Sequence, residues 1–97
     1  MTIDKKLENG KLTLSPAGRI DTNTSPELEA ELKLDGVTEV VFDFSAVEYI
    51  SSAGLRVLMT AQKAMMASGG KMEVANPNAM VKDVFDMTGM SGVFTIV

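Results

Sequence analysis

Two adjacent hydroxyl residues, Ser51 and Ser52, are the strongest candidates for chemistry in this sequence. They stand between an apolar run and an Ala-Gly step in "YISSAGLRV", where a helix-like pattern begins. A serine at such a position can cap the helix by accepting N–H bonds from its first turn. It can also act as a nucleophile, or receive a phosphate from another protein. These are the three roles open to Ser52, and the cap and phosphate-acceptor roles are compatible with each other.

The nucleophile role lacks the partner that it needs. The chain contains no His and no Cys, so the commonest general base and the thiol nucleophile are both missing. The "SSAG" sequence also differs from the G-x-S-x-G elbow of serine hydrolases. We therefore predict no catalytic residue, no metal site and no cofactor. Nucleotide binding is a further hypothesis, but the chain has no Walker loop and no G-x-G-x-x-G motif to support it.

The phosphate-acceptor role makes physical sense at this position. A phosphate on Ser52 would lie at a helix N-terminus, where N–H groups and the helix dipole favour negative charge. At about 100° per residue, Ser52 begins an outward stripe, and the opposite side is apolar. The stripe contains Ser52, Arg56, Met59, Lys63 and Met66. Exposed methionines are typical of adaptable binding surfaces, so we expect a partner there, although a plain solvated face is the alternative.

The elements before this helix begin with a predicted hairpin. Asn9-Gly10 suits a type I′ turn between strands at residues 2–7 and 11–15, and Pro16-Ala17-Gly18 interrupts the second strand. A short helix is expected next, capped by Thr24 or Ser25, with Pro26 in its first turn and Asp35-Gly36 as its limit.

The remaining elements alternate between strand and helix. The run "VVFDF" is nearly continuous in apolar residues, which predicts a strand covered on both faces. The helix that starts near Ser52 should end at Gly69-Gly70. "KMEVAN" predicts a strand, "PNAMVKDVFDMTG" a helix and "GVFTIV" a buried closing strand. We therefore predict one α/β domain over residues 1–97, with the hairpin leading into a mixed, largely parallel sheet and about three crossover helices.

The composition limits the partners and the compartment. The chain has 97 residues, 45% of them hydrophobic and 23% charged, with a net charge of −4. Because no basic run is present, we expect neither nucleic acid nor an anionic membrane as a partner. The sequence has no signal-peptide pattern and no apolar run near the ~18 residues of a membrane span. These features predict a soluble, cytoplasmic domain.

The segment "VVFDFSAVEYISSAGLRVL" resembles the signature of the STAS domain, the sulfate transporter and anti-sigma factor antagonist family. The resemblance rests on an apolar strand, then Asp43 and Ser45, the Tyr49-Ile50 pair, the two serines, and a small residue before Gly54-Leu55. "GRIDTNTSPEL" and "SGGKMEVANPNAMVKDVFDMTGM" are similar to flanking segments of the family, so the resemblance extends from about Lys11 to Val97.

The resemblance implies a protein-binding switch rather than an enzyme. Stand-alone bacterial members are anti-sigma factor antagonists, whose conserved serine is phosphorylated by an anti-sigma factor serine kinase and restored by a serine phosphatase. That serine corresponds to Ser52, with Ser51 as the alternative acceptor because it stands where the family often has Asp. The unmodified protein would bind the anti-sigma factor and release a sigma factor, and it would be a monomer when unbound.

The same resemblance, together with the outward stripe, suggests the partner-binding residues. They are Asp21, Thr22, Ser51, Gly54, Arg56, Met59 and Lys63. Asp21 corresponds to an acid near the phosphorylated serine, although it could instead cap a loop. A constitutive STAS adaptor, without a phosphoswitch, in another regulatory or transport assembly is the alternative function.

Overall fold

The N-terminal hairpin forms around the predicted Asn9-Gly10 turn. In the computed structural model, which describes residues 1–97, Asn9 and Gly10 have φ angles of 51° and 81°, as a type I′ turn requires. The strands on either side are β1 (Thr2–Glu8) and β2 (Lys11–Ile20). They are followed by α1 (Ser25–Ala30), β3 (Glu39–Asp43), β4 (Val47–Ile50), α2 (Ser52–Ser68), β5 (Lys71–Ala75), α3 (Ala79–Met87), the 3₁₀ helix η1 (Met90–Gly92) and β6 (Thr95–Ile96).

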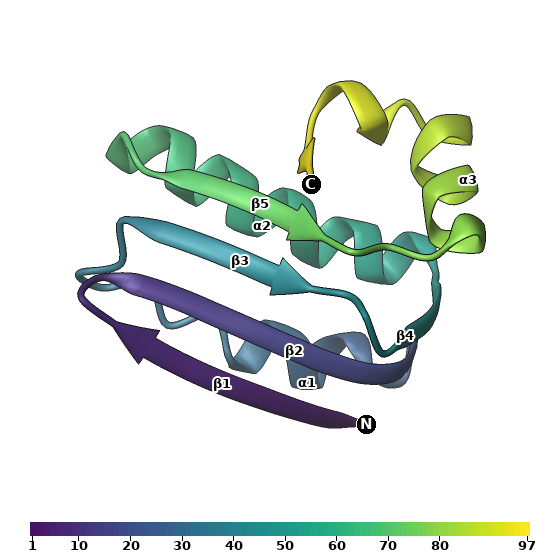
Figure 1. Cartoon of the computed structure of the whole chain (residues 1–97), viewed down its shortest axis with the longest axis horizontal. Coiled ribbons are helices and arrows are strands. Elements are labelled where there is room, and N and C mark those ends of the chain that lie inside the picture. The colour runs from purple at the N-terminus through teal and green to yellow at the C-terminus, as the bar shows by residue number, and fades with distance from the viewer.

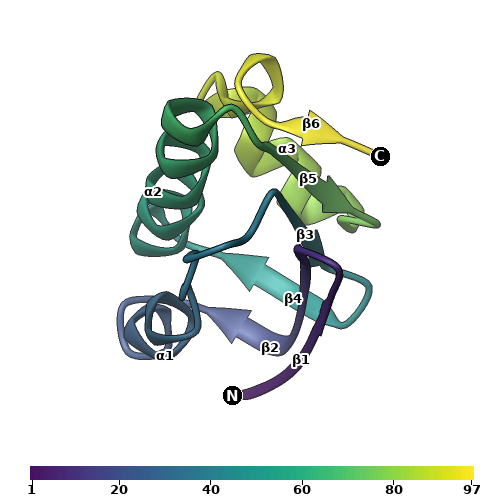
Figure 2. The same cartoon turned by 90° about the vertical axis from the view of Figure 1, so that its left-hand side faces the viewer.

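The strands form one mixed sheet in the order β1-β2-β3-β5-β6, with β4 paired to the far end of β2. Only the β1–β2 pair is antiparallel. Helices α1 and α2 lie side by side on one face, whereas α3 lies at the end of the sheet near β4 (Figures 1 and 2). The predicted fold class, a single α/β domain with an N-terminal hairpin and a largely parallel sheet, is confirmed.

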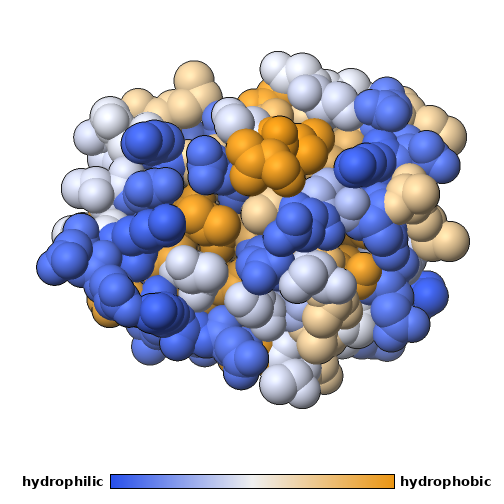
Figure 3. Space-filling view, in the orientation of Figure 1, coloured by the Kyte–Doolittle hydropathy of each residue, from blue (hydrophilic) through white to orange (hydrophobic).

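The core lies between the sheet and these helices. It is one cluster of 20 buried apolar residues, including Leu12, Leu14, Val40 and Phe42 from neighbouring strands. The prediction that β3 is covered on both faces is wrong, because its residues alternate between buried and half-buried and Val41 lies on the uncovered face. That face is mostly hydrophilic, with a few apolar clusters (Figure 3).

The sequence also predicted the end of β2 wrongly. The strand continues through Pro16 to Ile20, and its register with β4 shifts between Gly18 and Arg19. Pro16 has no N–H group, but its nitrogen faces away from β1, so no hydrogen bond to β1 is lost. On the other side, Pro16 lies beyond Leu14, the last β2 residue that pairs with β3. β4 was missed altogether because it is only 4 residues long and directly precedes α2.

The C-terminal segment is less regular than predicted. The expected strand "GVFTIV" is reduced to the two residues of β6, with η1 before it, and only Phe94 in this segment is buried. Phe94 packs edge-on against Phe85 of α3, with 5.5 Å between ring centroids. This aromatic contact helps to attach the C-terminal segment to the core.

Candidate functional site

The two serines have different positions at the start of α2. Ser51, not Ser52, is the N-cap, and its Oγ accepts a long hydrogen bond of 3.5 Å from the Gly54 N–H. The Ser51 N–H donates to the Ile20 carbonyl at 2.8 Å, which joins the cap to the end of β2. Ser52 is the first helical residue and is exposed. The idea that Ser52 caps the helix is therefore wrong, and its hydroxyl makes no hydrogen bond within the chain.

The outward stripe of α2 has almost the predicted composition. Ser52, Arg56, Lys63 and Met66 are exposed, and Met66 exposes 69% of its surface. Met59 is only half-exposed because it packs partly against the core. The stripe therefore presents two cations and one largely exposed methionine on the helix that begins at Ser52.

Gly54 does not belong to the accessible surface. A Cβ atom at this position would lie 2.6 Å from Ile50 Cγ1 and 2.7 Å from Ile20 Cγ2, so glycine allows α2 to approach β2 and β4 closely. The prediction that Gly54 contacts a partner directly is wrong, because the residue is buried. Its role is to set the position of the helix N-terminus.

Asp21 organises the loop between β2 and α1. Its carboxylate accepts hydrogen bonds from the N–H groups of Asn23 at 3.0 Å and Thr24 at 3.1 Å. The Thr24 N–H contributes most to holding the pKa of Asp21 below its ordinary range, while partial desolvation opposes the shift. The loop-capping role of Asp21 is confirmed, and its contact with a partner stays a prediction.

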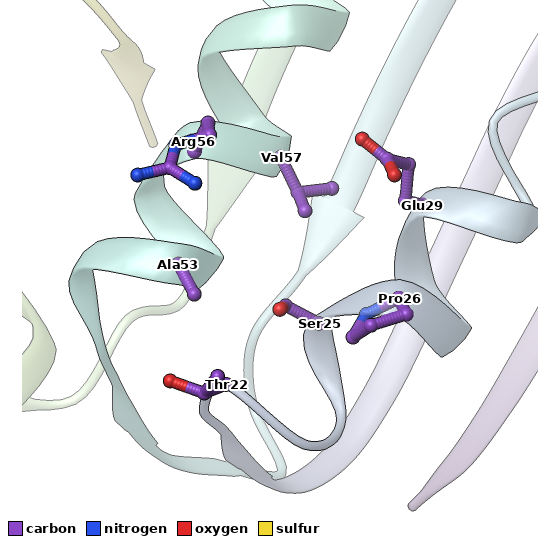
Figure 4. A pocket seen from close by; sticks show the side chains of 7 residues that line it. All are labelled: Thr22, Ser25, Pro26, Glu29, Ala53, Arg56 and Val57. Atoms are coloured by element: carbon purple, nitrogen blue, oxygen red, sulfur yellow. The ribbon is translucent and has the colours of Figure 1, made fainter.

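A shallow groove of about 260 Å³ separates the start of α2 from α1. Its lining residues are Thr22, Ser25, Pro26, Glu29, Ala53, Arg56 and Val57 (Figure 4). The hydroxyl of Ser25, a residue only 6% exposed, points into the space between the helices and makes no hydrogen bond within the chain (Figure 4). A groove with hydroxyl, carboxylate and guanidinium groups can accept polar side chains from a partner. Thr22 and Arg56 are the two predicted residues that it brings together.

The comparisons with known proteins identify the family. A STAS domain model matches residues 2–97, almost the whole chain. The chain belongs to the STAS domain family. BtrV of Bordetella bronchiseptica, named as an anti-sigma factor antagonist, is 31% identical over 99 residues, covering 99% of this chain and 84% of BtrV.

Solved structures agree on the fold. The anti-sigma factor antagonist SpoIIAA in its unphosphorylated form superposes with a TM-score of 0.85 at 16% identity, covering 99% of this chain and 88% of that chain. Bacillus SpoIIAA in the phosphorylated form gives a TM-score of 0.78 at 15% identity, covering 99% of this chain and 91% of the other. At these identities, the likeness shows the fold alone.

The STAS domain has a further polar contact beside Ser51 that the sequence did not predict. The Arg19 guanidinium lies over the Tyr49 ring, 4.5 Å from its centroid, and Arg19 Nε is 4.0 Å from Asp21 Oδ2. Arg19 and Tyr49 are register partners on β2 and β4. Because this pairing depends on the shift after Gly18, no local sequence signal indicated it.

Two other features bear on the function of this STAS domain. No group of three or more His, Cys, Asp or Glu side chains lies close enough together to hold a metal ion. None of the helices has the length and apolar character required to span a bilayer.

Proposed function

We propose that this STAS domain is an anti-sigma factor antagonist controlled by phosphorylation of Ser52. In its unmodified form it binds an anti-sigma factor, which is also its serine kinase, and so releases a sigma factor. Phosphorylation ends that complex, and a serine phosphatase restores the binding form. The protein acts in the cytoplasm as a substrate and binding partner, not as an enzyme. The relationship to BtrV supports the general role.

The exposed Ser52 hydroxyl at the N-terminus of a 17-residue helix is the observation that carries the phosphoswitch. The first turn of α2 contains no acidic residue, so a phosphate there would meet N–H groups and the positive end of the helix dipole. Ser51 suits phosphorylation less well, because it is half-buried and its oxygen already caps the helix. These contacts favour Ser52 over Ser51.

The effect on binding follows from where the new charge would lie. Ser52 begins the stripe with Arg56 and Lys63, and Arg56 also lines the groove beside α1. A phosphate adds about −1.5 to −2 charge to a surface that otherwise presents cations and apolar atoms. An anti-sigma factor that fits the unmodified surface would then have to bury an extra, unmatched charge.

Phosphate mapping tests the modification itself. The purified protein is incubated with ATP and its cognate anti-sigma kinase, and the modified residue is located by mass spectrometry. We expect phosphate on Ser52 in the wild type and in Ser51→Ala, and none in Ser52→Ala. Phosphate on neither serine, with a kinase active on itself or another substrate, would sink the proposal.

Ser52→Asp tests the consequence for binding. We expect at least a tenfold loss of affinity for the anti-sigma factor, measured by calorimetry, because the carboxylate introduces charge into the interface. The variant should remain folded, since an acid in the first helical turn stabilises a helix by about 0.3–1 kcal/mol. Thr95→Asp is the matched control, because it places the same charge on exposed β6.

A constitutive STAS adaptor is the second candidate function. It is favoured by one observation, namely that Ser51 occupies the place where the family often has an acid before the phosphorylated serine. An adaptor would bind its partner equally well as wild type and as Ser52→Asp. The calorimetric comparison therefore separates the two candidates.

A further inference from the structure

One edge of the sheet is formed by β1, and no other element lies beyond it (Figure 1). The two-residue turn makes Glu8 and Lys11 a hydrogen-bonded pair, so alternate β1 residues point their backbone groups towards β2. Ile3, Lys5 and Leu7 therefore direct their N–H and C=O groups outwards. An edge of this kind can accept another strand.

The side chains of β1 divide into two rows. Ile3, Lys5 and Leu7 lie on the helix side, opposite Pro16, Leu14 and Leu12 of β2. Leu7 is 57% exposed, although its register partner Leu12 is buried in the core. The other row, on the uncovered face, is Thr2, Asp4, Lys6 and Glu8. The edge thus combines one row with an apolar residue on either side of Lys5 and a second row in which acidic and basic residues alternate.

We propose that two copies of this chain associate weakly through β1, antiparallel and centred on Lys5. Ile3 of each copy then lies opposite Leu7 of the other, with their outward backbone groups hydrogen-bonded. On the uncovered face, Asp4 of each copy lies opposite Lys6 of the other. Opposite charges that face each other across antiparallel strands stabilise the pair.

Charge complementarity selects this register over its neighbours. A shift by one residue brings outward backbone groups against inward ones, so only shifts by two retain the ladder. A shift by two residues in one direction places Asp4 of one copy opposite Asp4 of the other, and a shift in the other direction places the two Lys6 residues opposite each other. Both registers therefore bring like charges together. Only the register centred on Lys5 uses all 7 residues of β1 and pairs acid with base.

The two Lys5 residues would face each other at the centre of this arrangement. Each Lys5 Nζ already lies 3.7 Å from Glu31 Oε2, just after α1. The centre would therefore contain two lysines and two glutamates, with no net charge. The charged edge limits the affinity, since lysines are typical of edges that resist pairing.

The association does not involve α2, so it is independent of the proposed phosphoswitch. The sequence led us to expect a monomer. A contact along one edge strand is small, and small contacts are characteristic of weak, transient complexes. We expect the dimer to be populated only at high protein concentration.

Sedimentation velocity over a concentration series tests the charge pattern. We expect Lys6→Asp to weaken dimerisation about tenfold, because two attractive pairs become repulsive. The double variant Asp4→Lys/Lys6→Asp exchanges the two charges and should restore dimerisation. Asp4 and Lys6 face the hydroxyl residues Ser15 and Thr13 across the hairpin, so neither substitution disturbs a buried contact. Circular dichroism checks that the variants fold. A strictly monomeric wild type at millimolar concentration, or a swap as weak as the single change, would overturn the proposal.

The absence of cysteine allows a direct measurement of the centre. Lys5→Cys places one thiol per copy beside the symmetry axis, so a short bis-maleimide should link two copies. Lys71→Cys, at the exposed first residue of β5, is the control and should link only slowly. Equal rates for the two variants would show that any self-association uses another surface, and so would also overturn the proposal.

Discussion

At the scale of single residues, Gly54 fixes how closely the serine-bearing helix approaches the sheet. Two isoleucine side chains from different strands, Ile20 and Ile50, occupy the space that a Cβ would need. The Ile20 carbonyl oxygen is also only 3.2 Å from that position. The backbone cannot move away easily, because Ser51 is hydrogen-bonded to the same carbonyl.

We expect Gly54→Ala to lower the free energy of unfolding by about 1–3 kcal/mol, because the added methyl group overpacks the core. Urea unfolding followed by circular dichroism measures the change. Gly92→Ala is the control, since a Cβ there meets nothing within 4 Å and no positive φ is required. Equal stability of the two variants would contradict the close-packing role of Gly54.

The carboxylate of Asp21 should make the stability of the folded protein depend on pH. Hydrogen bonds, chiefly from the Thr24 N–H, hold its pKa in the folded state below the ordinary range. The stabilisation is therefore complete above the unfolded pKa of about 4 and is lost as the pH falls through the lower folded pKa. We expect Asp21→Asn to be less stable than wild type at pH 7, and the difference to shrink as the pH falls from about 4 towards 2, measured by urea unfolding at each pH. A constant difference across this range would contradict the prediction.

At the scale of elements, Asn78 joins α3 to the strand that the sequence did not reveal. Its Oδ1 accepts from the Val81 N–H at 2.8 Å, which caps α3. Its Nδ2 donates to the carbonyls of Val47 at 3.1 Å and Glu48 at 3.2 Å. One side chain therefore satisfies both a helix end and the backbone of β4.

We expect Asn78→Ala to cost about 2 kcal/mol of stability, since it removes the cap and leaves two carbonyls without this partner. Thermal unfolding measures the effect. Asn23→Ala is the matched control, because the Asn23 side chain is exposed and makes no hydrogen bond, and its effect should stay within about 0.5 kcal/mol. A similar loss in both variants would show that the side-chain bonds of Asn78 do not matter.

At the scale of the whole molecule, a single apolar cluster connects the three α-helices with strands β2 to β5. The cluster includes Leu28 of α1, Leu58 of α2, Phe85 of α3 and Val74 of β5. A domain of this size with one core is expected to unfold in a single cooperative step.

Two spectroscopic probes test this cooperativity. Tyr49 is the only tyrosine and the chain has no tryptophan, so its fluorescence reports on β4 and the adjacent Ser51 region. We expect the urea transition followed by Tyr49 to coincide with that followed by far-UV circular dichroism. An earlier tyrosine transition would mean that the β4 end of the sheet unfolds separately from the core.

Much of this protein follows from its sequence because the deciding interactions are local. The Asn9-Gly10 turn, the Pro26 helix start and the period of α2 each depend on residues a few positions apart. The same local geometry predicted the exposed positions of Ser52, Arg56 and Lys63. The lack of His and Cys argued against the nucleophile role of Ser52 before the fold was known.

The tertiary structure decided what depends on residues far apart in the chain. Pairing between β2 and β4 brings Arg19 onto Tyr49 and supplies the Ile20 carbonyl that holds Ser51. Packing of α1 beside α2 creates the groove between them. The choice of Ser51 as cap follows from these contacts, because either serine satisfies the local pattern and only the approach of α2 to β2 and β4 distinguishes them.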